Sequence, residues 1–134
     1  MNDTSTALRE RSFAFALAIV KCVRLLENEQ KDWVLSRQLL KSGTSIGANI
    51  REARFAQSTS DFVSKLSIAL KEAEETQYWL DLLHGAGLIQ ADVHDELFAQ
   101  SDWLIGTLVN VIKSCKRKQS AQATPNHLGG ATAS

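Results

Sequence analysis

The stretch Ser42-Gly43-Thr44-Ser45-Ile46-Gly47-Ala48-Asn49-Ile50-Arg51-Glu52-Ala53 places small and polar residues where a helix usually buries large apolar ones. The residues on both sides of it have a strongly helical pattern. Each glycine inside a helix costs about 1 kcal/mol relative to alanine, so this block is unfavourable unless the helix packs closely against its neighbours. Gly43 and Gly47 are four residues apart and share one face, which predicts a tight crossing with another helix.

Polar side chains accompany the core stripe of this helix. Ser42 and Asn49 fall on or beside the stripe that Ile46, Ile50 and Ala53 form. A buried asparagine needs hydrogen-bond partners and can fix the register of a helix. We expect a structural polar network rather than a ligand site, and its members would be Ser42, Ser45, Asn49, Glu52 and Glu75.

Outward from this block, apolar residues recur at helical spacing along most of the chain. They predict four helices over about residues 6–27, 33–55, 59–84 and 90–117. Asp32 is a plausible N-cap, Ser58 with Asp61 resembles a capping box, and Gly85 is the expected left-handed residue after the third helix. The connections are short, so consecutive helices must be antiparallel.

The predicted fold is therefore an all-α, up-down-up-down four-helix bundle that occupies residues 1–118. Residues 119–134 are rich in small and polar types and contain Pro125, the only proline of the chain. We expect this tail to be disordered.

The first and fourth helices each carry two apolar stripes. In the first helix they are Leu8, Phe15, Ile19, Cys22 and Leu26, and Phe13, Leu17, Val20 and Val23. In the fourth they are Leu97, Leu104, Leu108, Val111 and Cys115, and Phe98, Ile105, Val109 and Ile112. A helix that covers one core needs one stripe, so the second stripe indicates a contact with another subunit or, alternatively, further neighbours within the monomer.

Composition limits the location and the class of protein. The chain has 15 basic and 15 acidic residues, so it is not a general polyanion-coating protein, although a local basic patch is compatible with this balance. Its longest apolar stretch, residues 13–26, is interrupted by Lys21 and Arg24 and is too short to span a membrane. The N-terminus lacks the basic segment of a signal peptide, and the two cysteines form no metal-binding or redox motif. We expect a cytoplasmic protein with reduced thiols, a Cys22–Cys115 disulfide being the alternative.

Two groups of basic residues are candidates for binding nucleic acid by neutralising phosphates. The first occupies one broad sector of the second helix, opposite its core stripe, and the second ends the fourth helix. The members are Arg37, Lys41, Arg51 and Arg54, and Lys113, Lys116, Arg117 and Lys118. The alternatives are a solvated face that forms salt bridges with the acidic third helix, and cations that complement a helix dipole.

Catalytic and metal-binding patterns are absent from the sequence. A di-metal bundle requires paired Glu-x-x-His motifs, which this chain lacks, and its three histidines have no ligand spacing. There is no nucleophile elbow, P-loop or dinucleotide fingerprint. We expect a protein without catalytic residues, metal or cofactor.

The opening block resembles the signature of the bacterial 23S rRNA intervening-sequence protein family, also called the S23 family. Ser60-Asp61-Phe62 and Lys65-Leu66 resemble the family's turn into its third helix. Lys71-Glu72-Ala73-Glu74-Glu75-Thr76-Gln77-Tyr78-Trp79-Leu80-Asp81-Leu82-Leu83 resembles its third-helix motif. The resemblance covers about residues 13–113 and extends to the accessory variability protein of diversity-generating retroelements.

This resemblance implies a ring-like homo-oligomer, a pentamer of bundles around a central axis. It also implies a basic surface that binds RNA or DNA and, in retroelements, a reverse transcriptase. Two hypotheses follow. The chain is a non-catalytic oligomeric scaffold that binds nucleic acid through its basic residues, or it is a scaffold that binds only a protein partner such as a reverse transcriptase.

Overall fold

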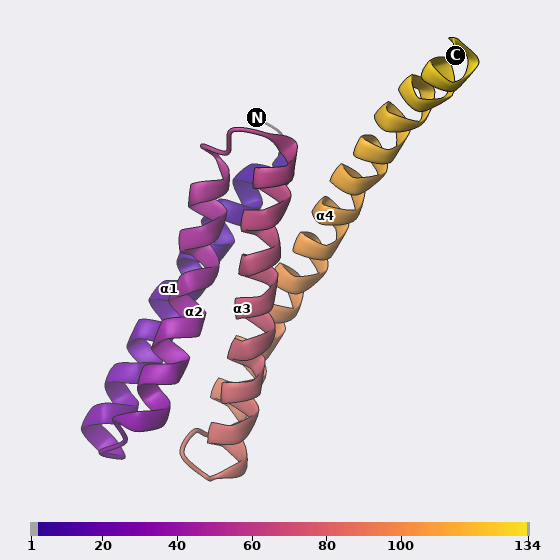
Figure 1. The fold of residues 1–134 in the computed structure, drawn as a ribbon. Helices are drawn as coiled ribbons and strands as arrows, with labels where there is room; N and C mark the ends of the chain where they lie inside the picture. The colour runs from indigo at the N-terminus through magenta and orange to yellow at the C-terminus, as the bar shows by residue number, and fades with distance from the viewer. Residues whose placement is uncertain (1–2, 134) are drawn as a thin grey trace.

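The computed structural model describes the backbone of residues 3–133 and the side chains of residues 3–122. Four helices follow one another: α1 (Asp3–Glu29), α2 (Val34–Ala53), α3 (Thr59–Gly85) and α4 (Ala91–Ala133). They run alternately down and up, and the described residues contain no strand (Figure 1). The predicted all-α antiparallel bundle is confirmed.

The helices are arranged in a cycle. α1 packs against α2, α2 against α3, α3 against α4, and α4 returns to α1. Within the described residues, the backbones of the diagonal pairs α1–α3 and α2–α4 do not come close to each other. Every helix therefore buries two flanks against neighbours and leaves an outer face exposed.

The core consists of one stripe from each helix. Large aliphatic side chains and one phenylalanine fill it, and many of these residues are completely buried. The fully buried large apolar residues are Phe15, Ile19, Leu39, Ile46, Leu66, Leu80, Leu83, Leu104 and Leu108. Burial of such side chains contributes about 1.5–3 kcal/mol each, which is the main source of stability for helices whose exposed faces are polar.

α1 approaches α2 most closely at the two glycines. A Cβ atom added at Gly43 would lie 2.8 Å from Cγ1 of Ile19, and one added at Gly47 would lie 3.4 Å from the carbonyl oxygen of Ser12. Ile19 and Ser12 are both buried. Small residues on α2 thus bring the two helix backbones together along this crossing.

The N-termini of α2 and α3 differ in their capping. Ser58 caps α3 by accepting a hydrogen bond from the Asp61 N–H at 3.0 Å. The Asp61 carboxylate in turn accepts from the Gln57 N–H at 3.3 Å. α2 begins one residue later than predicted, with Trp33 at the N-cap, yet the Asp32 carboxylate still accepts from the Ser36 N–H at 2.8 Å. Both helices therefore have a carboxylate near their positive end.

The left-handed residue after α3 is Gly87, with φ of 77°, and not Gly85 as predicted. α3 continues through Gly85, and the Leu88 N–H then donates to the Leu83 carbonyl at 2.9 Å. This is the six-residue closure of a Schellman motif. The shift of the left-handed residue by two positions places Leu88 against the core, which is the physical reason for the later stop.

α4 differs most from its predicted bounds. The sequence predicts its end near residue 117, whereas its backbone is helical to Ala133 and extends past the other three helices (Figure 1). The disorder expected for residues 119–134 stays a prediction. The side chains of residues 123–133, including Pro125, and the whole of Ser134 lie outside the described residues.

Candidate functional site

The expected polar network contains one buried link between helices. Ser42 of α2 and Thr76 of α3 are both buried, and their hydroxyl oxygens share a hydrogen bond 3.0 Å long. The Thr76 hydroxyl also lies 2.7 Å from the Glu72 carbonyl oxygen. Thr76 was not among the expected members, although its spacing from Ala73 and Leu80 places it on the core stripe of α3.

The other expected members do not join this pair. The Ser45 hydroxyl donates to the Lys41 carbonyl at 2.6 Å, and the Asn49 amide donates to the Ser45 carbonyl at 2.8 Å. These bonds stay within α2 because a carbonyl one turn back is nearer to a short side chain than any neighbouring helix. Glu52 lies 3.9 Å from Lys65, and Glu75 is exposed on α3, where its charge helps to raise the pKa of the partly desolvated Glu72.

The eight predicted phosphate-binding residues are all exposed: Arg37, Lys41, Arg51 and Arg54 on α2, and Lys113, Lys116, Arg117 and Lys118 on α4. Among the described residues, none of the eight forms an ion pair with a carboxylate. Arg51 and Arg54 instead lie over exposed aromatic rings, 6.0 Å from the Phe13 centroid and 5.6 Å from the Phe55 centroid. The charge of Lys41 partly offsets the raised pKa of Glu72 on α3, so the α2 stripe does interact electrostatically with α3, although none of its described members forms an ion pair there.

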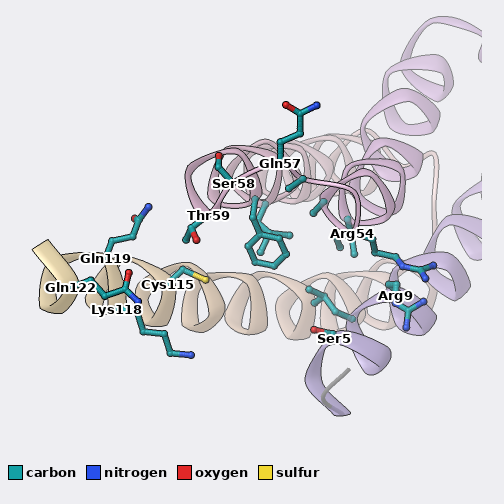
Figure 2. Close-up of a pocket in the computed structure, with 16 residues that line it drawn as sticks. Ser5, Arg9, Arg54, Gln57, Ser58, Thr59, Cys115, Lys118, Gln119 and Gln122 are labelled. Carbon is teal, nitrogen blue, oxygen red and sulfur yellow. The ribbon is translucent and has the colours of Figure 1, made fainter.

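A cavity of about 750 Å³ opens at the end of the bundle where α1 begins and α2 ends (Figure 2). We call it the cationic cavity. Five segments line it: the first turns of α1, the last turn of α2, the α2–α3 turn, the first turns of α3, and α4. The lining residues are Ser5, Leu8, Arg9, Ile50, Ala53, Arg54, Ala56, Gln57, Ser58, Thr59, Phe62, Leu66, Cys115, Lys118, Gln119 and Gln122.

The cationic cavity joins one member of each predicted basic group. Arg54 comes from the α2 stripe and Lys118 from the α4 cluster, and Arg9 of α1 adds a third cation. Among the described residues, no aspartate or glutamate lines the cavity. Sequence reasoning missed Arg9 because nothing in the local pattern of α1 distinguishes it. Only the convergence of three helices places it at the same cavity, beside Arg54 and at the end opposite Lys118 (Figure 2).

A second hollow, of about 960 Å³, runs along the outer side of α1 and α2. We call it the α1–α2 groove. Its floor contains small residues, among them Ala16, Gly47 and Ala48, and its lining includes Phe13, Arg51 and Phe55. Phe13 is 54% exposed and Phe55 is 75% exposed, which is unusual for aromatic side chains. The groove therefore combines apolar area with close access to the α2 backbone.

A histidine links α4 to α3 at the opposite end of the bundle. His94 Nε2 lies 2.8 Å from Asp81 Oδ1 of α3, and Nδ1 lies 2.9 Å from Asp95 Oδ1. The hydrogen bond to Asp81, with the one to Asp95, raises the pKa of His94 above its ordinary value of 6.5. Within the described residues, no three side chains are arranged to hold a metal ion.

The two cysteines are both free. Cys22 is buried in the core, and this burial raises the pKa of its thiol. Cys115 is half-buried and lines the cationic cavity, where Figure 2 draws it on α4. No described helix has an apolar stretch long enough to cross a membrane.

Comparisons with known proteins are consistent with this architecture. The model of the family described as 23S rRNA-intervening sequence protein matches residues 5–110. A crystal structure from Bacteroides thetaiotaomicron VPI-5482, described as a protein with unknown function from the S23 ribosomal protein family, is 46% identical. The match covers 82% of this chain and 98% of that chain, with a TM-score of 0.81. The comparison with curated protein sequences finds no match.

Proposed function

This chain belongs to the 23S rRNA-intervening sequence protein family, and we propose that it is a non-catalytic, ring-like oligomeric scaffold that binds nucleic acid through its basic residues. The relative from Bacteroides thetaiotaomicron is itself described as having unknown function. The proposal is therefore argued from the surface of this chain. The pentameric stoichiometry is the one that the family resemblance implies.

The observation that carries the scaffold proposal is the α1–α2 groove with its exposed apolar rim. Phe13 and Phe55 line the groove, and Leu17, one turn after Phe13 on α1, is 48% exposed. Clustered apolar side chains on a surface mark sites of protein association, and aromatic residues are enriched there. We propose that this face packs against a neighbouring copy of the chain.

The second apolar stripes of α1 and α4 differ in how far their side chains are exposed. Phe13 and Leu17 on α1 are exposed, whereas Phe98, Ile105 and Val109 on α4 are half-buried within the monomer. The second stripe of α4 is thus largely explained by intramolecular packing. Of these two second stripes, that of α1 has the greater apolar area left for another subunit.

Assembly is tested by sedimentation velocity at micromolar protein concentration. We expect the wild type to be an oligomer and the double variant Phe13→Ser/Leu17→Ser to be a monomer with unchanged helical circular dichroism. Leu25→Ser is the matched control, because Leu25 is an exposed leucine of the same helix that lies about two turns beyond Leu17, away from the groove. A monomeric wild type, or an equal effect of the control, would overturn the assembly proposal.

Nucleic-acid binding is supported by the eight exposed cations, which form no ion pair in the described part of the chain. Arginine forks suit phosphate oxygens, and repetition around a ring would add the charges of several subunits. The test is fluorescence anisotropy with structured RNA and duplex DNA at about 50 and 200 mM salt. Several phosphate contacts predict an affinity that falls by orders of magnitude over this range.

Charge reversal identifies the surface involved. We expect Arg51→Glu/Arg54→Glu to abolish binding, and the charge-matched control Lys21→Glu/Arg24→Glu on the exposed side of α1 to retain it. Absence of binding at low salt would contradict this part of the proposal. It would favour the alternative, a scaffold that contacts only a protein partner such as a reverse transcriptase.

The non-catalytic part of the proposal rests on the sequence, which lacks the nucleophile, phosphate-loop and dinucleotide motifs described above. We propose the cytoplasm as the location. Two free thiols in one small domain fit a reducing compartment.

A further inference from the structure

We propose that the cationic cavity binds a small amphiphile with an anionic head and an apolar chain, a free fatty carboxylate being the simplest example. The cavity shares Arg54 and Lys118 with the basic groups proposed to bind nucleic acid, and Arg9 and Arg54 with the α1–α2 groove, but the inference requires neither oligomerisation nor nucleic-acid binding. It rests on the charge, the shape and the lining of one cavity. Its volume, about 750 Å³, lies within the roughly 300–1,000 Å³ of small-molecule sites.

The charge of the lining selects an anion. Arg9, Arg54 and Lys118 line the cavity and no carboxylate does, although the chain as a whole has equal numbers of acids and bases. Cations that face one cavity repel each other, and a bound anion offsets this repulsion. Ser58 and Thr59 add the positive end of the α3 dipole.

The apolar residues of the lining favour a ligand that has a hydrocarbon part. Leu8, Ile50, Ala53 and Leu66 are buried core residues that also line the cavity, and Phe62 packs beside them. These four residues are almost completely buried, so the apolar surface that a ligand can cover is that of the half-buried Ala56, Phe62 and Cys115. An inorganic anion would leave this surface in contact with water, whereas a hydrocarbon chain would remove it from water.

The arrangement of the lining assigns a direction to the ligand. Figure 2 draws Arg9 and Arg54 at one end of the cavity, and Cys115, Lys118, Gln119 and Gln122 along α4 toward the other. Two guanidinium groups at one end match the two oxygens of a carboxylate. The apolar chain then extends toward Cys115 and ends before the polar side chains of Lys118, Gln119 and Gln122.

An amphiphile fits this lining better than a phosphodiester chain does. A nucleotide would place polar base edges and ribose hydroxyls against aliphatic side chains that cannot pair with them. The one aromatic ring in the lining, Phe62, offers little stacking surface because it is packed against the core. Binding of RNA in this cavity would therefore contradict the proposal.

Cys115 provides the readout in the full-length protein. Iodoacetamide, a neutral reagent, alkylates accessible thiols, and mass spectrometry reports Cys115 and the buried Cys22 separately. With dodecanoate in about tenfold excess over its Kd, we expect alkylation of Cys115 to slow by about tenfold. Cys22 is the internal control for unfolding, and its rate should not rise.

Two control ligands test the contributions of the anionic head and of the apolar chain separately. Acetate has the head without the chain, and dodecyltrimethylammonium has the chain with the opposite charge. We expect neither to protect Cys115. Equal protection by the cationic amphiphile would overturn the proposal, because the cations would then have no role.

Variant controls identify the head-group site. We expect Arg54→Gln to weaken protection by dodecanoate at least about tenfold, because the variant loses a charge-assisted hydrogen bond to the carboxylate. Arg37→Gln is the matched control, because Arg37 is an exposed arginine of α2 that does not line the cavity. An equal effect of both variants would refute the assigned head-group site.

Three further outcomes would each overturn the proposal. Protection of Cys115 without ligand that increases with protein concentration would mean that a second copy fills the cavity. Protection by an RNA oligonucleotide equal to that by dodecanoate would assign the cavity to nucleic acid. Protection by phosphatidylglycerol vesicles alone, and not by dissolved dodecanoate, would assign it to a membrane lipid.

Discussion

At Gly43 the missing side chain lets α1 and α2 approach each other. A Cβ atom there would lie 2.8 Å from Cγ1 and 2.9 Å from Cγ2 of Ile19, which is completely buried. Isoleucine is branched at Cβ, so its Cγ2 cannot move aside without a shift of the residue itself. Gly106 of α4 is also inside a helix, but it is exposed and a Cβ there would meet nothing within 4 Å.

These two glycines give a matched prediction for stability. Gly43→Ala should lower the free energy of unfolding by about 1–3 kcal/mol, because overpacking outweighs the gain in helix propensity. Gly106→Ala should raise it by up to about 1 kcal/mol, since only the propensity term remains. Urea denaturation measures both changes. If Gly43→Ala were stabilising as well, the close approach of α1 to α2 would not depend on the missing side chain.

At the scale of elements, one ionisable side chain contributes to the junction of α3 and α4. His94 is only 15% exposed and lies between Asp81 of α3 and Asp95 of α4. His84 of α3 also faces it, with ring centroids 4.9 Å apart, and Phe98 stacks on its other side. When both ring nitrogens are protonated, each donates a hydrogen bond to a carboxylate and the imidazolium ties the two helices together.

The raised pKa of His94 predicts how stability changes with pH. A pKa that is higher in the folded than in the unfolded protein gives stabilisation that is complete below pH 6.5 and is lost as the pH rises through the folded pKa. Both carboxylates are mostly exposed, so we expect a loss of about 0.3–1 kcal/mol. Urea denaturation at about pH 5.5 and pH 8.5 measures this difference. The variant His94→Gln should lack it, and an unchanged pH dependence in that variant would show that the bridge contributes nothing.

At the scale of the whole molecule, the three shorter helices and the first part of α4 form the packed bundle. Leu97, Leu104, Leu108 and Ile112 anchor α4 in the core. After Ile112, α4 makes few contacts with the rest of the described chain. One is a hydrogen bond of 3.3 Å from the Gln119 amide to the Ser60 hydroxyl, and α4 then passes the end of the bundle (Figure 1).

Hydrogen exchange tests how far the bundle extends. We expect amides of residues 97–112 to be protected to nearly the global stability, because their side chains are buried against α1 and α3. From residue 119 onward, amides should exchange almost as fast as in an unstructured peptide, since an isolated helical segment is marginal in water. Strong protection after residue 119 would contradict the predicted disordered tail.

The sequence by itself was sufficient for the four helices and their antiparallel order. Apolar periodicity, the Ser58 cap and the short connections act within a few residues, and local interactions of this kind can be read directly along the chain. The sequence by itself did not determine that Gly87, and not Gly85, is the left-handed residue after α3. Both glycines permit a left-handed conformation, and only the packing of Leu88 against the core separates them.

The tertiary structure alone decided which residues meet. The sequence shows two apolar stripes on both α1 and α4, but burial of Ile112 and exposure of Phe13 depend on neighbours distant in the chain. The Ser42–Thr76 hydrogen bond and the gathering of Arg9, Arg54 and Lys118 at one cavity have the same origin. Local periodicity determines which face of a helix is apolar, whereas the angle and register at which helices pack determine what each face contacts.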